Sequence, residues 1–442
     1  MNTSIPHREL GSSTAHRQGA VLRWALGGTV TLLASYLIGL ELQRRGWATY
    51  QFPQTVLWCL IPYAVTAHWL YSGAYLPQFE GRSFLIVATA VPYLATPLGF
   101  ALLQRPYSRG AVLLSYLLSA AWFLAGHWRQ RRLHALRLAC LDASVPSRLR
   151  ELLGTPAGAG LRHIALRPWA EFTASSPAAR PGADAPWAGV VLDTRTPPDE
   201  ARERQICALR LQHVRLYSVE TVAELLSGRK MLPAASVHDL WALDGHPAYD
   251  SVKRLLDAAL VIATLPLWLP LCLLVGLGVK LDSPGPMLFS QMRVGRNGRP
   301  FRLWKLRSMR TATPGTESAR FASVDDERVT RLGRFIRRMR LDELPQLWNV
   351  LRGDMSLIGP RPEQAQFVEA FAARIPAYPY RHLVRPGLTG WAQVQQGYAG
   401  SEEETSVKLS YDLYYLEHYS LSLDLLIAYK TVRIVLTGFG AR

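Results

Sequence analysis

Two adjacent carboxylates, Asp342 and Glu343, directly follow the arginine-rich segment 331–340, which reads RLGRFIRRMR. Apolar and basic residues of that segment recur at helical spacing on different sides, which predicts an amphipathic basic helix. The positive field of such a helix favours the ionised form of both carboxylates and lowers their pKa. An ionised carboxylate can bind Mg²⁺ or attack a phosphorus atom. The pair is therefore a candidate catalytic centre and metal site, although an isolated Asp-Glu dipeptide more often begins a surface helix.

Cations that could bind phosphate oxygens lie on both sides of this pair in the sequence. Arg361 is confined between Pro360 and Pro362, because proline fixes its own φ and restrains the residue before it. An arginine fixed in this way suits bidentate phosphate recognition. A diphosphate needs several cations, because its charge must be neutralised before an anionic nucleophile approaches. The candidate phosphate-binding residues are Lys305, Arg307, Arg338, Arg361 and Arg385.

Short elements must position these side chains. The sequence predicts strands at 289–293 and 301–306, joined by a tight hairpin turn at 295–298. The returning strand and the residue after it carry three cations in near alternation: Arg302, Lys305 and Arg307. At least two of them should therefore share one face of the hairpin. Near the C-terminus, 421–437 fits a helix on a membrane surface and fits a packed core helix equally well.

Four apolar segments in the first third of the chain each approach the ~20 residues that cross a bilayer as a helix. They are 20–42, 54–76, 84–103 and 111–128. Residues 1–19 are polar, lack the pattern of a secretory signal and are expected to be flexible. The densest arginine cluster flanking these segments lies at 128–150. The positive-inside rule therefore predicts that this end, and with four spans also the N-terminus, is cytoplasmic.

A fifth apolar stretch, 255–279, has Pro266 and Pro270 near its middle. A proline inside a helix removes a hydrogen bond and costs ~3 kcal/mol, so two prolines four residues apart predict a sharp break. Basic residues at both ends agree with a re-entrant hairpin that enters and leaves the membrane on the same face. The alternative is a straight, kinked fifth span, which would put everything after residue 280 outside the cell.

Residues 135–246 are predicted to form a small α/β domain. Runs at 188–192 and 213–217 are typical of buried strands, and 219–226 is typical of a helix. No G-x-G-x-x-G fingerprint is present, so the sequence does not support a bound dinucleotide. A structural or oligomerisation spacer is the simplest interpretation of this domain.

The composition limits the class of protein. Hydrophobic residues make up 49% of the chain and charged residues 19%, which indicates membrane spans in one region and soluble parts elsewhere. The formal net charge of +17 implies an anionic partner. Nucleic acid is not expected, because aromatic residues do not interleave with the basic ones and the apolar spans argue against it. The four cysteines lie far apart without a CxxC pair, which indicates neither a disulfide framework nor a zinc site.

The stretch from about 250 to 440 resembles the bacterial sugar transferase family, the monotopic phosphoglycosyl transferases. The motifs that carry this resemblance, in the family's order, are KRLLDAAL at 253–260, FRLWKLRSM at 301–309, LDELPQLWNVLRGDMSLIGPRP at 341–362 and RPGLTGWAQV at 385–394. Four spans and a small soluble domain ahead of this block are similar to the large branch of the family. That branch initiates exopolysaccharide, capsule or O-antigen synthesis.

The resemblance implies a membrane α+β protein with surface amphipathic helices in its catalytic domain. The expected regions are four transmembrane helices within 20–128, a small cytoplasmic α/β domain at 135–246 and a catalytic domain at 250–442 that contains the re-entrant helix. The implied location is the bacterial inner membrane, with several spans and the catalytic domain on the cytoplasmic face. A homodimer is compatible with the middle domain.

The resemblance further implies a polyprenyl-phosphate glycosyl-1-phosphate transferase. Such an enzyme moves a sugar 1-phosphate from a UDP-sugar to undecaprenyl phosphate and releases UMP in a ping-pong reaction. Asp342 matches the nucleophile that forms a phosphosugar–aspartyl intermediate. Glu343 completes the dyad and would assist Mg²⁺ or orient the site. Lys305, Arg361 and Arg385 match positions that contact phosphates or support the dyad.

Pro266 matches the proline that breaks the family's re-entrant helix. The family often has Ser-Pro at this point, whereas this chain has Leu265-Pro266. The serine hydroxyl that could bridge the broken backbone is therefore missing, and Thr264 or Pro270 would have to compensate.

Other functions remain open from the sequence. A non-enzymatic membrane scaffold could use the basic half to bind anionic lipid or a polysaccharide-assembly partner, but it would tolerate Asp342→Asn. A processive glycosyltransferase would need a D-x-D metal motif after a nucleotide fold, and none is evident. The residues do not identify the sugar: glucose and galactose are favoured, and N-acetylated sugars stay open.

Overall fold

The computed structural model describes most of the chain, and the ranges are 14–72, 82–133, 136–154, 164–174, 187–196, 199–212, 214–231, 247–310, 328–396 and 402–437. Contacts divide the chain into a first unit, Met1–Gly228, and a second unit, Arg229–Arg442. Residues 1–13 of the predicted flexible N-terminus and 232–246 of the predicted middle domain lie outside the described ranges. The predicted domain boundaries stay predictions.

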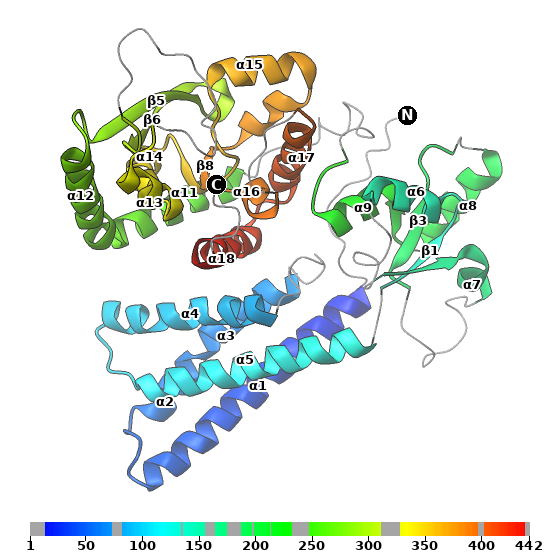
Figure 1. Ribbon diagram of the computed structural model, residues 1–442. Helices are drawn as coiled ribbons and strands as arrows, with labels where there is room; N and C mark the ends of the chain where they lie inside the picture. The colour runs from blue at the N-terminus through cyan, green and yellow to red at the C-terminus, as the bar shows by residue number, and fades with distance from the viewer. Residues whose placement is uncertain are drawn as a thin grey trace. The chain divides into compact units, whose positions relative to one another are not determined.

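The first unit begins with helices at all four predicted apolar segments (Figure 1). They are α1 (Thr14–Arg44), α2 (Phe52–Trp58), α3 (Leu60–Ser72), α4 (Arg82–Leu102) and α5 (Arg109–Leu133). The segment predicted at 54–76 is divided between α2 and α3 at Cys59. Pro62 explains the division, because it cannot donate to the carbonyl four residues earlier.

Four helices of the described chain are long and apolar enough to cross a membrane. The stretches are Ala25–Arg44, Phe84–Leu102, Arg109–Trp128 and, in the second unit, Leu265–Asp282. Large apolar side chains on these helices face outward, and Leu94 and Leu98 on α4 are 76% and 63% exposed. An exposed apolar surface of this extent is typical of contact with lipid. These helices indicate a membrane protein.

A four-stranded parallel sheet follows in the same unit, in the order β2-β1-β3-β4. The strands are β1 (Leu136–Cys140), β2 (Ile164–Pro168), β3 (Gly189–Leu192) and β4 (Leu216–Ser218). The helices are α6 (Val145–Leu153), α7 (Trp169–Ala174), α8 (Glu200–Leu211) and α9 (Val219–Ser227). The fold around the predicted strands is therefore α/β.

The local predictions for this sheet differ in accuracy. The strand predicted at 188–192 is confirmed as β3, whose four residues are all buried, and the helix predicted at 219–226 is confirmed as α9. The strand predicted at 213–217 is shorter and shifted toward the C-terminus, as β4. Ser218 fixes this boundary, because its hydroxyl accepts a hydrogen bond from the Thr221 amide and caps α9.

The second unit begins with two apolar helices, α11 (Pro247–Ala263) and α12 (Leu265–Asp282), separated at Thr264. Pro266 lies in the first turn of α12, where its missing N–H removes no intrahelical bond. Pro270 lies inside α12 and does not end it, so the predicted interruption of the apolar stretch lies at Thr264, directly before Leu265 and Pro266. Whether this helix pair enters and leaves a membrane on one face stays a prediction.

Two side chains satisfy the backbone at this break. The Thr264 hydroxyl donates to the Leu260 carbonyl at 2.7 Å, and the Trp268 indole donates to the Val261 carbonyl at 3.0 Å. The Leu260 carbonyl also accepts from the Thr264 amide at 3.0 Å, so the hydroxyl adds a second hydrogen bond there. Whether Thr264 replaces the missing serine stays a prediction.

The rest of the second unit folds against this helix pair as short elements (Figure 1). The antiparallel hairpin consists of β5 (Leu288–Val294), the turn η3 (Arg296–Gly298) and β6 (Pro300–Leu306). Next come α13 (Arg331–Arg338), η4 (Leu341–Glu343), α14 (Gln346–Arg352), β7 (Ser356–Ile358), α15 (Ala365–Arg374) and η5 (Tyr378–Leu383). The chain continues with β8 (Gly387–Thr389), α16 (Trp391–Gln395), α17 (Glu402–His418) and α18 (Leu421–Thr437).

The hairpin predicted around 289–306 is confirmed, and its inner face joins the core of this unit. Phe301 and Leu303 pack with Val261, Trp268 and Val350, which come from α11, α12 and α14. The hairpin therefore lies against the helix break on one side and near the acidic pair on the other.

Helix α18 is packed in its first half and partly exposed in its second half. Leu423, Leu426 and Ile427 in its first half are 0–1% exposed and belong to the core. Val432 and Val435 in its second half are 58% and 39% exposed. The packed-helix interpretation holds for the first half.

Candidate active site

The acidic pair lies in the single turn η4, between α13 and α14. The predicted basic helix 331–340 is confirmed as α13, but it ends at Arg338. Arg340 then adopts a left-handed conformation with φ of 54°. This conformation costs a non-glycine residue roughly 1–2 kcal/mol and turns the chain sharply. The turn brings Asp342 and Glu343 inward, where they are only 9% and 7% exposed.

The packing of α13 fixes which of its arginines reach the pair. Thr330 caps the helix by accepting a hydrogen bond from the Gly333 amide. Gly333 lies against the backbone of Ser308, where an added Cβ would be 2.0 Å from the carbonyl oxygen. Arg337 lies one turn further along the same face, and its Nε donates to the Ser308 hydroxyl at 2.7 Å. Arg338 points to solvent instead.

Glu343 is the most heavily paired group of the site. Its Oε1 lies 2.7 Å from Arg361 and 3.5 Å from Lys305, and its Oε2 lies 3.8 Å from Arg340. Burial by itself would raise the pKa of this carboxyl. The three cations outweigh burial and lower the pKa of Glu343 to about 2. Glu343 is therefore ionised at neutral pH and serves to hold the cations together.

Asp342 is in the opposite situation. Among the described residues it has no hydrogen-bond or ion-pair partner, so its carboxylate is available to a ligand. Burial raises its pKa and the negative charge of Glu343 adds to this, while Lys305, Arg337 and Arg361 act against it; the net shift is upward. The prediction that the positive field lowers the pKa of both carboxyls is correct for Glu343 and wrong for Asp342. Burial of Asp342 and the negative charge of Glu343 outweigh the three cations.

Lys305 comes to the pair from the end of β6, where it faces Phe289 across the hairpin. Burial lowers the pKa of its ammonium group, and Glu343 acts against this shift. Arg307, two residues further, does not join the pair. Its guanidinium donates to the carbonyls of Pro284 and Ser283 near the end of α12, at 2.5 and 2.6 Å. Because the strand ends at Leu306, the alternation predicted for these cations does not continue to Arg307.

Arg361 is placed by the segment Pro360–Glu363, which follows β7. Its Nη2 donates to Glu343, and its own carbonyl accepts a hydrogen bond from Arg381 Nη2 at 2.9 Å. The interaction with Glu343 raises the pKa of the Arg361 guanidinium. The Arg361 side chain is 31% exposed, so part of it can contact a ligand beside Glu343.

Arg385 belongs to a different group of charges. Burial lowers its pKa, and the charged groups that act on it are Arg296, Asp250, Arg254 and Asp257, from η3 and α11. The structure therefore brings Lys305 and Arg361 to the acidic pair, leaves Arg338 in solvent, and gives Arg307 and Arg385 other surroundings. Their predicted role in phosphate binding stays a prediction.

The arginines of 331–340 were expected near the pair as a group, with Arg338 singled out, but Arg337 and Arg340 are the ones that act on it. A charged group behind the site was missed; it consists of Glu363, Arg381, Lys408 and Asp412. A signal for Arg337 was present, because a glycine inside a helix often marks a close approach and Arg337 lies four residues after one. Arg381 and Asp412 lie 31 residues apart and offered no local pattern.

A metal ion would find few protein ligands here. Within the described residues no group of three or more His, Cys, Asp or Glu side chains could hold a metal ion. Asp342 offers one free carboxylate, whereas Glu343 is already shared among three cations. One carboxylate completed by substrate phosphates is a common arrangement for Mg²⁺. The donor set thus fits a metal ion that arrives with a phosphate ligand.

Comparison with known proteins identifies the family. The model of the bacterial sugar transferases matches residues 248–438. A UDP-glucose:undecaprenyl-phosphate glucose-1-phosphate transferase of Caulobacter vibrioides is 46% identical over 196 residues, 44% of this chain and 73% of that protein. The chain belongs to the bacterial sugar transferase family. The resemblance found in the four motifs is thereby confirmed.

Other relatives differ in length and in the sugar that their names specify. An N-acetylgalactosaminephosphotransferase of Aeromonas hydrophila that acts on UDP-N-acetylgalactosamine and undecaprenyl phosphate is 47% identical over 240 residues, 54% of this chain. The match spans 56% of that relative's length. The exopolysaccharide production protein PSS of Rhizobium leguminosarum is 38% identical over 191 residues, 42% of this chain and 96% of that protein.

Proposed function

We propose that this chain transfers a sugar 1-phosphate from a UDP-sugar to undecaprenyl phosphate and releases UMP. Family membership supports the class of reaction, since relatives are named as transferases between these substrates. The observation that carries the proposal is the contrast within the acidic pair. Glu343 is held by three cations, while the adjacent Asp342 carboxylate is free among the described residues.

In the first step, an Asp342 carboxylate oxygen forms a bond to the sugar-linked phosphorus of the UDP-sugar. The bond from that phosphorus to the bridging oxygen breaks, and UMP leaves with the electron pair. In the second step, an oxygen of the lipid phosphate attacks the same phosphorus and Asp342 leaves as a carboxylate. Splitting one displacement into two in this way is covalent catalysis. The product is an undecaprenyl diphosphate sugar.

The cations around Asp342 bind and orient the phosphate groups of the substrates. Arg361 and Lys305 share Glu343 with each other, so their positive charges are fixed within reach of the phosphate that Asp342 attacks. Arg337 adds a third cation that acts on Asp342. Positive groups placed before the reaction stabilise the charge that develops on phosphate oxygens. Glu343 is a poor general base, because its low pKa gives it little affinity for a proton.

Mg²⁺ belongs to the proposal as an ion bound with the substrate. Asp342, together with Glu343 at its edge, would hold it beside the diphosphate, and its charge would help to neutralise the phosphate oxygens. The location proposed for the chain is the bacterial inner membrane, with the acidic pair on the cytoplasmic face. A homodimer through the first unit is compatible with this arrangement.

The test is a UMP-release assay with purified full-length chain, undecaprenyl phosphate, Mg²⁺ and a panel of UDP-sugars, with UDP-glucose and UDP-galactose first. Release with one sugar is expected, together with a labelled phosphosugar that stays on the wild type but not on Asp342→Asn. Absence of release with every sugar would contradict the proposal and favour a membrane scaffold.

A further inference from the structure

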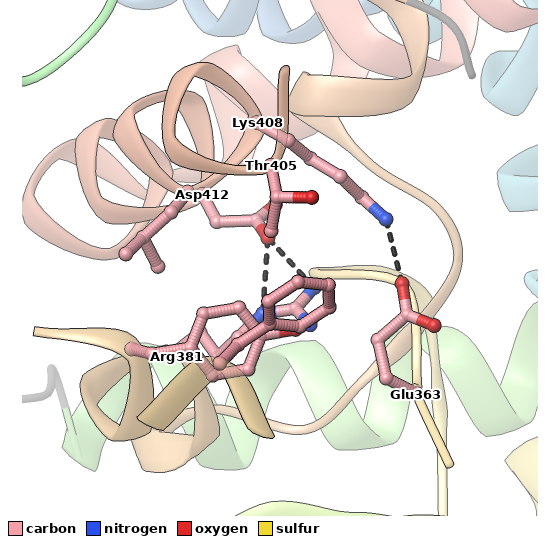
Figure 2. A pocket seen from close by; sticks show the side chains of 8 residues that line it. Glu363, Arg381, Thr405, Lys408 and Asp412 are labelled. Atoms are coloured by element: carbon pink, nitrogen blue, oxygen red, sulfur yellow. Dashed lines mark hydrogen bonds and ion pairs between the residues drawn. The ribbon is translucent and has the colours of Figure 1, made fainter. Parts of the chain in front are cut away.

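A small pocket near Arg361 is lined by one buried and one partly buried ion pair, shown in Figure 2. Asp412 on α17 accepts two hydrogen bonds from Arg381 on η5, from Nε at 3.1 Å and from Nη2 at 2.7 Å. Both side chains are only 2% exposed. Beside them, Lys408 lies 2.6 Å from Glu363. An ion pair buried this deeply is weak evidence for a stabilising role, because desolvation offsets its attraction.

Both pairs act on the short segment that carries Arg361. Arg381 Nη2 donates to the Arg361 carbonyl at 2.9 Å, and Arg293 donates to the Pro362 carbonyl at 3.3 Å. Glu363, the next residue, forms an ion pair with Lys408 and lies 3.6 Å from Arg293. Burial alone would raise the pKa of Glu363, but its cationic neighbours lower it overall. Three consecutive residues are thus held by charged side chains.

Only an arginine can make all the contacts that Arg381 makes. It uses Nε and Nη2 for Asp412, Nη2 again for the Arg361 carbonyl and Nη1 for the Tyr378 hydroxyl at 2.8 Å. These acceptors lie around one rigid plane, which suits the fixed fork of a guanidinium. A lysine ammonium is a single point on a flexible stem and cannot satisfy all three acceptors from the same place.

We infer that Arg381, anchored by Asp412, is a positioning residue that fixes the backbone of Arg361 and so aims its guanidinium at Glu343 and the substrate phosphate. The part of this inference that concerns the substrate rests on the proposed function. The part that concerns the backbone does not. A misplacement of about 1 Å in a positioned group can cost a hundredfold in rate, so this anchoring bears on turnover.

Two amides report directly on the segment without any assay of activity. The Val294 amide donates to the Glu363 carbonyl and the Gly387 amide donates to the Pro360 carbonyl, both at 2.9 Å. These bonds flank Arg361 on both sides. If Arg381 holds the segment, loosening it should expose both amides to exchange with solvent deuterium.

The experiment compares Arg381→Lys with a matched control, Glu417→Gln, in the full chain. Glu417 lies on the same helix as Asp412 and forms a buried pair with Lys230 at 2.8 Å. In Arg381→Lys, exchange at Val294 and Gly387 should accelerate about tenfold, as expected for the loss of one hydrogen bond from a charged group. In the UMP-release assay, kcat should fall about tenfold to a hundredfold, while KM for the UDP-sugar changes less than about threefold. Glu417→Gln should change neither measurement.

Several results would overturn the inference. These are unchanged exchange at both amides, faster exchange with unchanged kcat, and equal effects in Glu417→Gln. If Arg381→Lys does not fold, the variant Asp412→Asn takes its place, because it keeps Arg381 but removes the negative charge that anchors this arginine. We then expect faster exchange at both amides and a lower kcat, each by a smaller factor. If the wild type releases no UMP, the proposed function fails, and the exchange measurement still decides whether Arg381 holds Arg361.

Discussion

Two regions of this protein gather buried charges, and they do so in different ways. At the carboxyl ends of β1 and β3 in the first unit, opposite charges and hydrogen bonds are matched. Asp142 accepts from Arg202 at 2.8 Å, while Asp193 accepts from Ser144 at 2.9 Å and lies 3.6 Å from Arg148. Open parallel sheets usually bind ligands at this edge. Here the chain's own ionic contacts occupy it.

At the acidic pair of the second unit the charges are distributed unequally. Glu343 has three cations, and its neighbour Asp342 has no partner among the described residues. Two carboxyls whose surroundings push their pKa values apart are typical of a catalytic site. This difference shows that a cluster of buried charges does not by itself indicate a functional site. A carboxylate without a partner among the described residues, next to one with several cations, is the better indicator.

The largest effect is expected from Asp342→Asn. Because the proposed nucleophile is lost, turnover should fall by on the order of a thousandfold or more. The melting temperature should hardly change, because Asp342 makes no bond to the described chain and burying a charge is unfavourable. UMP release and thermal unfolding measure the two quantities. A variant that stays active would remove the contrast on which the proposed function depends.

Lowering the pH should destabilise the second unit through Glu343, the carboxyl paired with three cations. The pKa of Glu343 is lowered from an ordinary value of 4.5 to about 2, so its contribution to stability is complete above about pH 4.5 and is lost as the pH falls toward 2. The shift corresponds to about 3 kcal/mol in the free energy of unfolding. Acid unfolding followed by fluorescence should therefore be less steep in Glu343→Gln than in the wild type. Asp342, whose pKa is raised, changes the pH dependence of stability in the opposite direction. The same slope of stability against pH in the wild type and in Glu343→Gln would contradict the lowered pKa of Glu343.

In the first unit, Asp193→Asn should lower stability and leave turnover unchanged, whereas Asp342→Asn should lower turnover and leave stability unchanged. The amide still accepts from Ser144 but leaves Arg148 with Glu220 as its one anionic partner among the described residues, so the unit should lose about 1–2 kcal/mol of stability. Turnover of the folded enzyme should be unchanged, because this region is a structural network. Thermal unfolding and kcat, measured on the same preparation, test both statements. A selective loss of kcat would show that the sheet edge takes part in the reaction.

The smallest effect is expected from Arg338→Gln. The side chain is exposed, and surface substitutions of this kind change stability by less than about 0.5 kcal/mol. Its neighbour provides the comparison, since Arg337→Gln removes a cation that acts on Asp342. We expect kcat to fall in Arg337→Gln and to stay within about twofold of wild type in Arg338→Gln, consistent with the weak effect of exposed charges. Equal losses of kcat in the two variants would contradict the conclusion that Arg337, and not Arg338, lies on the face of α13 that is directed toward the acidic pair.

Much of the candidate site could be predicted because its signals are local. The dipeptide Asp342–Glu343, the basic helix before it and the hairpin with Lys305 each depend on neighbouring residues, and the structure contains all three. The interruption of the apolar stretch near Pro266 was predictable for the same reason, since proline acts on its own helix. The exact position of the interruption was not predictable, because a helix can continue past a proline such as Pro270 when its surroundings tolerate the lost bond.

The order of residues specifies which chemical groups are available: the acidic pair, the arginines near it, the apolar helices and the motifs of the family. Which of these groups come into contact depends on how the chain packs. The packing of Gly333 on Ser308 set the rotation of α13 and so selected Arg337 in place of Arg338. Burial raised the pKa of Asp342 against the field of its arginines, and Asp412 met Arg381 across 31 residues. Local patterns are fixed by backbone geometry, whereas burial and helix rotation depend on residues far away in the chain.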